Sequence, residues 1–310
     1  MGTAVLHYVL RPQFVVLLLV VISATAVHYR GKVRLKFARQ LTDHSTFTAP
    51  YNALVYLFSR TPTTPYLDVA AFPELKPLAE NWRTIREEGL RLMDEGFIRA
   101  ATANNDLGFH TFFRAGWKRF YLKWYDEAPP SALALCPQTT ALLKTVPSVH
   151  GAMFATLPAG GRLGKHRDPF AGSLRYHLGL VTPNSDACWI EVDGQRYSWR
   201  DGEPVMFDET YVHTAMNEAD TTRLILFCDV ERPVRAPIRR LNRFMIHKVM
   251  RSTATQNVEG ERVGVLNRMF DGVYRLKSWG QAQKARNRRL YYAVKYVVIA
   301  VVLALVLAPI

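Results

Sequence analysis

The residues best suited to chemistry are a histidine and an aspartate two positions apart, His166 and Asp168. On an extended backbone, residues two apart point to the same side, so this imidazole and this carboxylate can hold one metal ion. A second imidazole must come from another strand, and His213 is placed to supply it. Two histidines and one carboxylate leave positions of Fe(II) open for a chelating cosubstrate and dioxygen. The predicted metal ligands are therefore His166, Asp168 and His213.

Three further residues that carry, or can carry, a positive charge lie on segments of strand-like pattern near these ligands. Arg223 starts a segment of alternating pattern, where its guanidinium is placed to hold the distal carboxylate of 2-oxoglutarate in a bidentate clamp. Arg175 and His177 share one face of the segment 174–181. An inward Arg175 has an alternative role, as the ion-pair partner of a core carboxylate such as Asp208.

Short β segments must position these residues. From residue 148 onward, strand-like runs alternate with turn signals, and Asp193-Gly194 is a strong hairpin signal because it tolerates positive φ angles. Upstream, residues 43–77 are expected to be irregular and 74–95 helical. The predicted strands are 174–181, 188–192, 195–199, 203–208 and 223–230, which favours an antiparallel sandwich or barrel.

The net charge of +14 on 310 residues is concentrated in three runs, 30–40, 232–251 and 284–289. The rest of the chain carries 24 basic and 26 acidic residues, which argues against a nucleic-acid-binding domain. The run 232–251 either attracts anionic lipid or forms a solvated face beside the bilayer.

Two of these basic runs adjoin long apolar segments, 14–27 and 291–310. Both segments are predicted to span a membrane; a cleaved signal peptide is the alternative for the first. Since basic flanks prefer the cytoplasmic side, residues 30–289 are expected in the cytoplasm. The three cysteines are widely spaced and include no CxxC pair, which suits that compartment. The amphipathic segment 265–279 either lies along the membrane surface or docks on the domain.

Five ordered blocks between residues 117 and 233 resemble the aspartyl/asparaginyl β-hydroxylase family of Fe(II)- and 2-oxoglutarate-dependent oxygenases. The blocks are 162–170, 174–180, 199–203, 207–213 and 223–230. The resemblance implies a mainly β domain with flanking helices, folded as a double-stranded β-helix of the jelly-roll or cupin-like kind. It also implies iron on His166, Asp168 and His213, and 2-oxoglutarate held by Arg223 with help from His177 and Arg175.

Within the family, the loop that follows His166 and the two apolar ends are most similar to bacterial members that 2-hydroxylate a secondary acyl chain of lipid A. The expected protein is thus a dioxygenase whose cytoplasmic domain faces the bacterial inner membrane, with lipid A or a related acylated lipid as substrate and no obligate protein partner. The alternatives are a hydroxylase of peptidyl Asp or Asn and a non-enzymatic cupin-like lipid-binding module.

The expected organisation has five parts. They are an anchor at 1–29, a basic and helical lead-in at 30–106, the oxygenase domain at 107–233, a basic and partly helical region at 234–289, and a transmembrane helix at 290–310.

Overall fold

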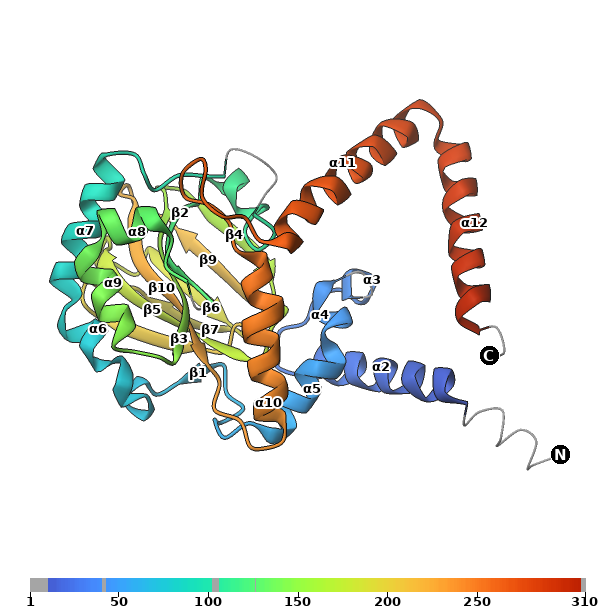
Figure 1. Ribbon diagram of the computed structural model, residues 1–310, viewed down its shortest axis with the longest axis horizontal. Helices are drawn as coiled ribbons and strands as arrows, with labels where there is room; N and C mark the ends of the chain where they lie inside the picture. The colour runs from blue at the N-terminus through green and yellow to red at the C-terminus, as the bar shows by residue number, and fades with distance from the viewer. Residues whose placement is uncertain (1–10, 41–42, 102–105, 126, 308–310) are drawn as a thin grey trace.

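Figure 1 shows the computed structural model, which describes residues 11–40, 43–101, 106–125 and 127–307. The strands are β1 (Tyr66–Leu67), β2 (Lys118–Trp124), β3 (Val149–Leu157), β4 (Arg162–His166), β5 (Ser173–Val181), β6 (Cys188–Val192), β7 (Gln195–Ser198), β8 (Pro204–Phe207), β9 (His213–Asn217) and β10 (Arg223–Glu231). They form two antiparallel sheets, one ordered β1-β8-β5-β10-β3-β2 and the other β4-β9-β6-β7.

From β3 onward the chain passes back and forth between the sheets. Strands β3, β5, β8 and β10 lie in the larger sheet, and β4, β6, β7 and β9 lie in the smaller one. Eight strands divided in this way have the order of a jelly roll. The mainly β architecture with flanking helices that the sequence predicts is confirmed.

Strand β5 shows why the sequence alternates there. Leu174, Tyr176 and Leu178 pack in the apolar core beneath the outer helices. Arg175 and His177 point to the opposite side and line a cavity between the two sheets. The helices bury one face of the strand and the smaller sheet covers the other, so nearly every residue of β5 is buried.

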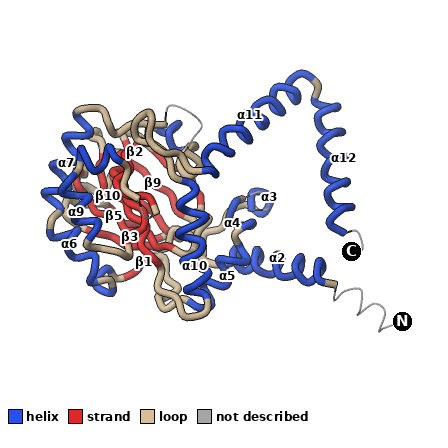
Figure 2. Tube along the Cα trace, viewed as in Figure 1, coloured by secondary structure: helices blue, strands red, loops and turns tan. Residues whose placement is uncertain are grey.

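The outer face of the larger sheet is covered by helices at the left of Figures 1 and 2. The helix predicted over 74–95 is present in pieces, because the chain breaks at Asn81 between two helices. Ile85 and Leu92 are fully buried against the sheet core. The covering helices are α6 (Lys76–Glu80), α7 (Trp82–Asp94), α8 (Pro130–Leu135) and α9 (Pro137–Lys144).

The prediction that residues 43–77 are irregular is wrong. The segment contains α4 (His44–Phe47) and α5 (Ala49–Phe58), and β1 extends the larger sheet. The Asp43 side chain accepts the N–H of Ser45 and so caps α4, while Pro50 occupies the first turn of α5, where no N–H is needed. A further short helix, α3, spans Phe37–Gln40.

The Asp193-Gly194 hairpin is confirmed. The two residues have φ angles of 51° and 83° and connect β6 to β7. Positive φ at both positions is what a type I′ turn requires.

The apolar N-terminal segment forms α2 (Pro12–Tyr29), which has a mean hydropathy of 1.8. By length and composition, α2 alone among the described helices is able to cross a membrane. The predicted C-terminal span falls on α12 (Arg288–Leu307) and on residues 308–310, which lie outside the described residues. That α12 spans a membrane stays a prediction.

Two more helices precede α12, namely α10 (Ile238–Phe244) and α11 (Val265–Arg286). In Figure 1, α11 projects from the body and α12 turns back on the side to which α2 also extends. The segment 265–279 contacts the body at its start, where Asn267 Oδ1 accepts the N–H of Leu107 and Phe270 packs against His110. Farther along, the helix projects from the body, and several of its apolar residues are exposed, namely Val265, Met269, Val273, Leu276 and Trp279.

Candidate metal centre

The three predicted metal ligands meet between the sheets. His166 ends β4, His213 begins β9, and the two residues are register partners on these neighbouring strands. Asp168 follows β4 and is held by its backbone N–H, which donates to the carbonyl oxygen of Glu209 at 3.0 Å. One potential ligand atom from each of the three residues lies within 4.8 Å of the others. The geometry thus brings together the set that the sequence singles out.

The two imidazoles are in the form that binds metals. Burial lowers the pKa of His166 to about 3, helped by the adjacent His213, and lowers the pKa of His213 to about 4. Both rings are therefore neutral at neutral pH. Each Nδ1 is paired with a backbone carbonyl, Gly164 at 2.7 Å and Tyr211 at 3.0 Å, which leaves each Nε2 free to coordinate. Two neutral nitrogens and one carboxylate fit Fe(II).

Arg175 forms an ion pair with Asp168, one of the three predicted metal ligands. Its Nη2 lies 2.7 Å from Asp168 Oδ2 and 3.3 Å from Asp229 Oδ1, and its Nε donates to Glu209 Oε2. Arg175 does form ion pairs with core carboxylates, as the alternative interpretation predicts. Its partners are Asp168, Glu209 and Asp229, and not Asp208. These contacts favour a role in orienting Asp168, and a direct role in binding 2-oxoglutarate stays a prediction.

The carboxylates around Arg175 are themselves perturbed. Burial raises the pKa of Glu209 to about 8, against the opposing effect of Arg175. Burial likewise raises the pKa of Asp229. Tyr125 donates to Asp229 at 3.1 Å and Ser173 donates to Glu209 at 2.8 Å, so the cluster is hydrogen-bonded beyond the guanidinium. Hydrogen-bonded groups of this kind around a metal ligand hold it in one orientation, and here they would hold Asp168.

Arg223 is a buried cation with no carboxylate partner among the described residues. It is 2% exposed, and its guanidinium carbon lies 4.2 Å from the ring centre of Trp199. Its side chain makes no hydrogen bond or ion pair with any residue that the structure describes, and burial lowers its pKa to about 10. Leaving a charge buried and unpaired is costly, so the site is suited to an anionic ligand.

His177 has two buried ring nitrogens, and neither finds a partner in the described chain. Burial lowers its pKa well below the usual value, with Arg175 and Arg223 adding to the effect. A neutral imidazole therefore faces the space beside Arg223. One cavity is lined by all six predicted site residues: His166, Asp168, Arg175, His177, His213 and Arg223.

Arg167, the residue between two of the ligands, is fastened to the end of α2. Its side chain is 1% exposed and donates to the carbonyl oxygens of Val27 at 2.6 Å and His28 at 3.4 Å. The last carbonyls of a helix lack intrahelical partners and favour a cation. The loop that carries His166 and Asp168 is consequently held by the N-terminal helix.

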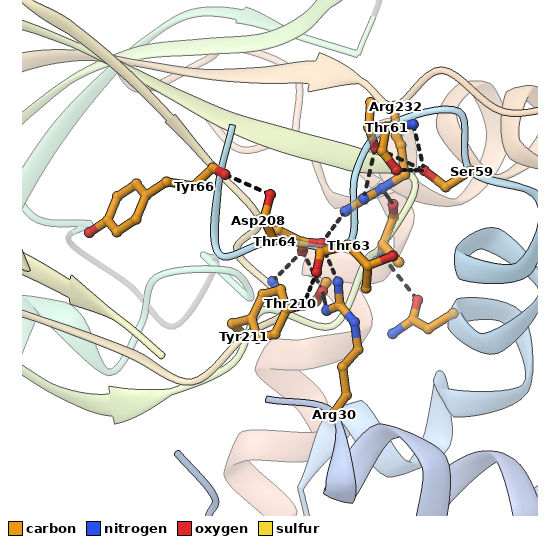
Figure 3. Close-up of polar contacts among 12 residues, drawn as sticks. Arg30, Ser59, Thr61, Thr63, Thr64, Tyr66, Asp208, Thr210, Tyr211 and Arg232 are labelled. Atoms are coloured by element: carbon orange, nitrogen blue, oxygen red, sulfur yellow. Dashed lines mark hydrogen bonds and ion pairs between the residues drawn. The ribbon is translucent and has the colours of Figure 1, made fainter. Parts of the chain in front are cut away.

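A second contact joins the end of α2 to the turn before β9. Figure 3 shows Arg30 reaching Asp208, with Nη2 2.6 Å from Oδ2. The same guanidinium lies 4.0 Å from the ring centre of Tyr56 and 3.9 Å from that of Tyr211. We call this arrangement, Arg30 held between two rings on Asp208, the Arg30 latch.

Asp208 receives a second cation, because Arg232 Nη2 lies 2.8 Å from the same carboxylate oxygen. Burial opposes ionisation, yet the two guanidiniums hold the pKa of Asp208 well below its usual range. The sequence places Arg30 and Arg232 in basic runs beside the bilayer. For these two residues that interpretation is wrong, since their side chains are 11% and 2% exposed and bind a fully buried carboxylate.

Two members of the site escape the sequence argument, Glu209 and Asp229. Asp229 is the register partner of Arg175 on the adjacent strand β10. Asp229 lies an even number of residues after Arg223 on the same strand, so the two side chains point to the same face. This alternation could have identified Asp229 from the sequence. Glu209 lies in the block 207–213 and carries no local signal of its own.

Comparison with known proteins matches a profile described as aspartyl/asparaginyl beta-hydroxylase to residues 79–233. An ornithine lipid ester-linked acyl 2-hydroxylase from Rhizobium tropici is 30% identical over 191 residues, or 60% of this chain and 66% of that protein. The human aspartyl/asparaginyl beta-hydroxylase is 29% identical over 171 residues, or 54% of this chain and 22% of its own length. The chain thus matches just under two thirds of the first relative and about a fifth of the second.

A crystal structure of a Pseudomonas putida prolyl-4-hydroxylase is similar at 20% identity, covering 50% of this chain and 88% of that chain with a TM-score of 0.35. The family profile spans half of the 310 residues. It includes every residue that lines the cavity around His166, Asp168 and His213, which we call the metal cavity. This chain belongs to the aspartyl/asparaginyl β-hydroxylase family.

Proposed function

We propose that the protein is an Fe(II)- and 2-oxoglutarate-dependent dioxygenase that adds a 2-hydroxyl group to a secondary acyl chain of lipid A. The domain within residues 107–233 would work at the cytoplasmic face of the bacterial inner membrane, anchored through 1–29 and 290–310. The observation that carries the proposal is that one cavity is lined both by three residues able to hold a metal ion and by the buried guanidinium of Arg223, which has no hydrogen-bond or ion-pair partner among the described residues.

The residues present fit both the metal and the cosubstrate. His166, Asp168 and His213 would hold Fe(II), and Arg223 would bind the distal carboxylate of 2-oxoglutarate, whose charge it needs. When bound, the metal with its cosubstrate supplies the oxidation: 2-oxoglutarate and dioxygen give succinate and carbon dioxide, and the second oxygen atom enters a C–H bond of the substrate. Neutral His177 lies beside Arg223 and lines the same space.

The protein's own contribution is orientation and the exclusion of water. The cavity walls are largely aromatic, among them Phe109, Phe112, Trp117 and Phe207. Such walls accept hydrocarbon and keep bulk water away from the reacting carbon. An acyl substrate is further supported by the Rhizobium tropici relative, which is named for the 2-hydroxylation of a lipid acyl chain.

The test is a mass measurement on lipid. The full-length chain in detergent is supplied with Fe(II), 2-oxoglutarate, dioxygen and lipid A, with ornithine lipid and an Asp- and Asn-containing peptide in parallel reactions. We expect lipid A to gain one oxygen atom, with succinate formed in equal amount, and Asp168→Ala to abolish both. Oxygen gained only by the peptide would establish the peptidyl hydroxylase alternative. Lipid binding without succinate from any substrate would establish a non-enzymatic lipid-binding module.

A further inference from the structure

The segments 29–40 and 43–48 form a surface around the end of α2, which we call the α3–α4 surface. It carries two phenylalanines that face outward: Phe37 on α3 is 67% exposed, and Phe47 at the end of α4 is 77% exposed. Neither side chain belongs to one of the apolar clusters of the described core. An apolar layer that covered both rings would remove them from water, which is favourable.

The position of this surface is fixed by α2. The Phe37 ring packs edge-to-face on the ring of His28, with 5.9 Å between their centres, and α4 lies against α2. Val27 and His28, in the last turn, are the buried residues of α2, so the helix leaves the body at this turn (Figure 1). A helix of 18 residues is about 27 Å long, close to the thickness of the hydrocarbon layer. With α2 across a bilayer, as proposed, Phe37 lies at the level of the lipid headgroups.

The charges around the two phenylalanines match an anionic surface. Between residues 29 and 48 the only acidic residue is Asp43, which is buried and caps α4. Tyr29 is 60% exposed, and its ring centre lies 4.8 Å from the guanidinium carbon of Arg34. Aromatic rings and cations gather at the interface of a bilayer, and anionic lipid attracts the cations. Four cations of the α3–α4 surface are exposed: Lys32, Arg34, Lys36 and Arg39.

The α3–α4 surface is joined to the loop that carries two of the predicted metal ligands. Arg39 Nη2 donates to the carbonyl oxygen of Lys165 at 3.0 Å. His44 Nε2 donates to the carbonyl oxygen of Arg167 at 2.6 Å. These two carbonyls stand on either side of His166, so hydrogen bonds hold the loop and the α3–α4 surface together.

The metal cavity reaches the surface of the protein at this same loop. The side chains of His166 and Asp168 are 15% and 22% exposed. The other four predicted site residues are buried, namely Arg175, His177, His213 and Arg223. A substrate would therefore approach the metal past the two exposed ligands, beside α3 and α4.

We infer that the α3–α4 surface docks on the headgroup layer of an anionic bilayer, into which Phe37 and Phe47 insert. Docking holds the mouth of the metal cavity against the leaflet, so that an acyl chain enters the cavity directly from the bilayer. The route of the acyl chain rests on the proposed function. The docking itself rests on the exposure of the two rings, the charges around them and the position of α2.

The test places a fluorescent label on the surface. The three native cysteines are buried, so the new cysteine in Phe37→Cys or Phe47→Cys can be labelled selectively with nitrobenzoxadiazole. The full-length variants are placed in nanodiscs of phosphatidylcholine and phosphatidylglycerol in equal parts. The matched control is Leu133→Cys, at an exposed leucine of α8, on the opposite side of the body from α2 in Figure 1. We expect nitroxide-bearing lipid to quench the two surface labels about five-fold more strongly than the control label.

Equal quenching at all three positions would overturn the docking. Protection of the surface labels from iodide, without quenching by the lipid, would mean that a second copy of this chain covers the rings and would overturn the bilayer as the partner. Nanodiscs of phosphatidylcholine alone should give weaker quenching, because the four exposed cations then face no anionic lipid. Unchanged quenching in those nanodiscs would refute the preference for an anionic bilayer.

Turnover tests the route of the acyl chain separately. The double substitution Phe37→Ser with Phe47→Ser should raise KM for lipid in nanodiscs about ten-fold, with kcat and Co(II) affinity unchanged, because only the supply of acyl chains is affected. Leu133→Ser is the control and should leave KM unchanged. A fall in kcat or in Co(II) affinity would mean that the two rings support the metal loop structurally, and an unchanged KM would refute the route. If no lipid gains oxygen, the labels still decide the docking.

Discussion

Removing the Arg30 latch should loosen both the fold and the metal centre. In Arg30→Gln, Asp208 keeps only Arg232, and the space between the rings of Tyr56 and Tyr211 loses its cation. Breaking a buried ion pair costs about 3–5 kcal/mol, and loss of the ring contacts adds about 1 kcal/mol. Because the second guanidinium remains on Asp208, the expected loss is about 3 kcal/mol, at the lower end.

For a chain of 310 residues, a loss of about 3 kcal/mol lowers the melting temperature by about 5 °C. The metal centre is affected because Asp208 is followed by Glu209, whose carbonyl holds the Asp168 N–H and whose carboxylate holds Arg175. We therefore expect Co(II), used as a stand-in for Fe(II), to bind about ten-fold more weakly to Arg30→Gln at a temperature where the variant is fully folded.

The assay is thermal melting in detergent together with a Co(II) titration followed by visible absorption. The matched control is Lys32→Gln, which removes an exposed charge two residues away and should leave both readouts unchanged. Arg30→Lys keeps the charge and should fall between the wild type and Arg30→Gln. A lower melting temperature with unchanged Co(II) affinity would refute the link to the metal centre, and unchanged melting would refute the latch itself.

Three further predictions address the site and the pH dependence of stability. His166→Ala should abolish Co(II) binding and succinate formation with an unchanged circular dichroism spectrum; retained binding would mean that the ligand is misassigned. Arg223→Gln should raise the 2-oxoglutarate concentration needed for half-maximal succinate formation by more than about ten-fold, with Co(II) affinity kept, because a charged hydrogen-bonded clamp is lost. The stability that ionised Asp208 contributes should be present above about pH 4 and be lost as the pH falls toward its depressed pKa, so the melting temperatures of the wild type and Asp208→Asn should converge in acid; a constant difference would contradict the shifted pKa.

The sequence predicts the site best where the pattern is local. The alternation of the strand that carries Arg175 and His177 gives both the strand and the face that lines the cavity. The two-residue spacing of His166 and Asp168 likewise predicts that the two ligand side chains point to the same side of the chain. These signals work because side-chain direction along a strand is fixed by the backbone.

What the sequence could not give are contacts between distant parts of the chain. Arg30 lies 178 residues before its partner Asp208, and Arg167 lies 140 residues after Val27. An isolated arginine beside an apolar helix has the same appearance whether its charge faces lipid headgroups or a buried carboxylate. Its role therefore emerges only when the fold brings the partner within reach.

The hydrogen bonds from Arg167 to the carbonyls of Val27 and His28 bear on how this protein can be produced for study. A shortened version that starts after residue 29 would dissolve more readily, but it would strip two acceptors from a guanidinium lodged between the ligands. Loss of metal binding in such a preparation would then reflect a disturbed candidate metal site. Solubility should be sought by exchanging outward-facing residues of α2 while its final turn is retained.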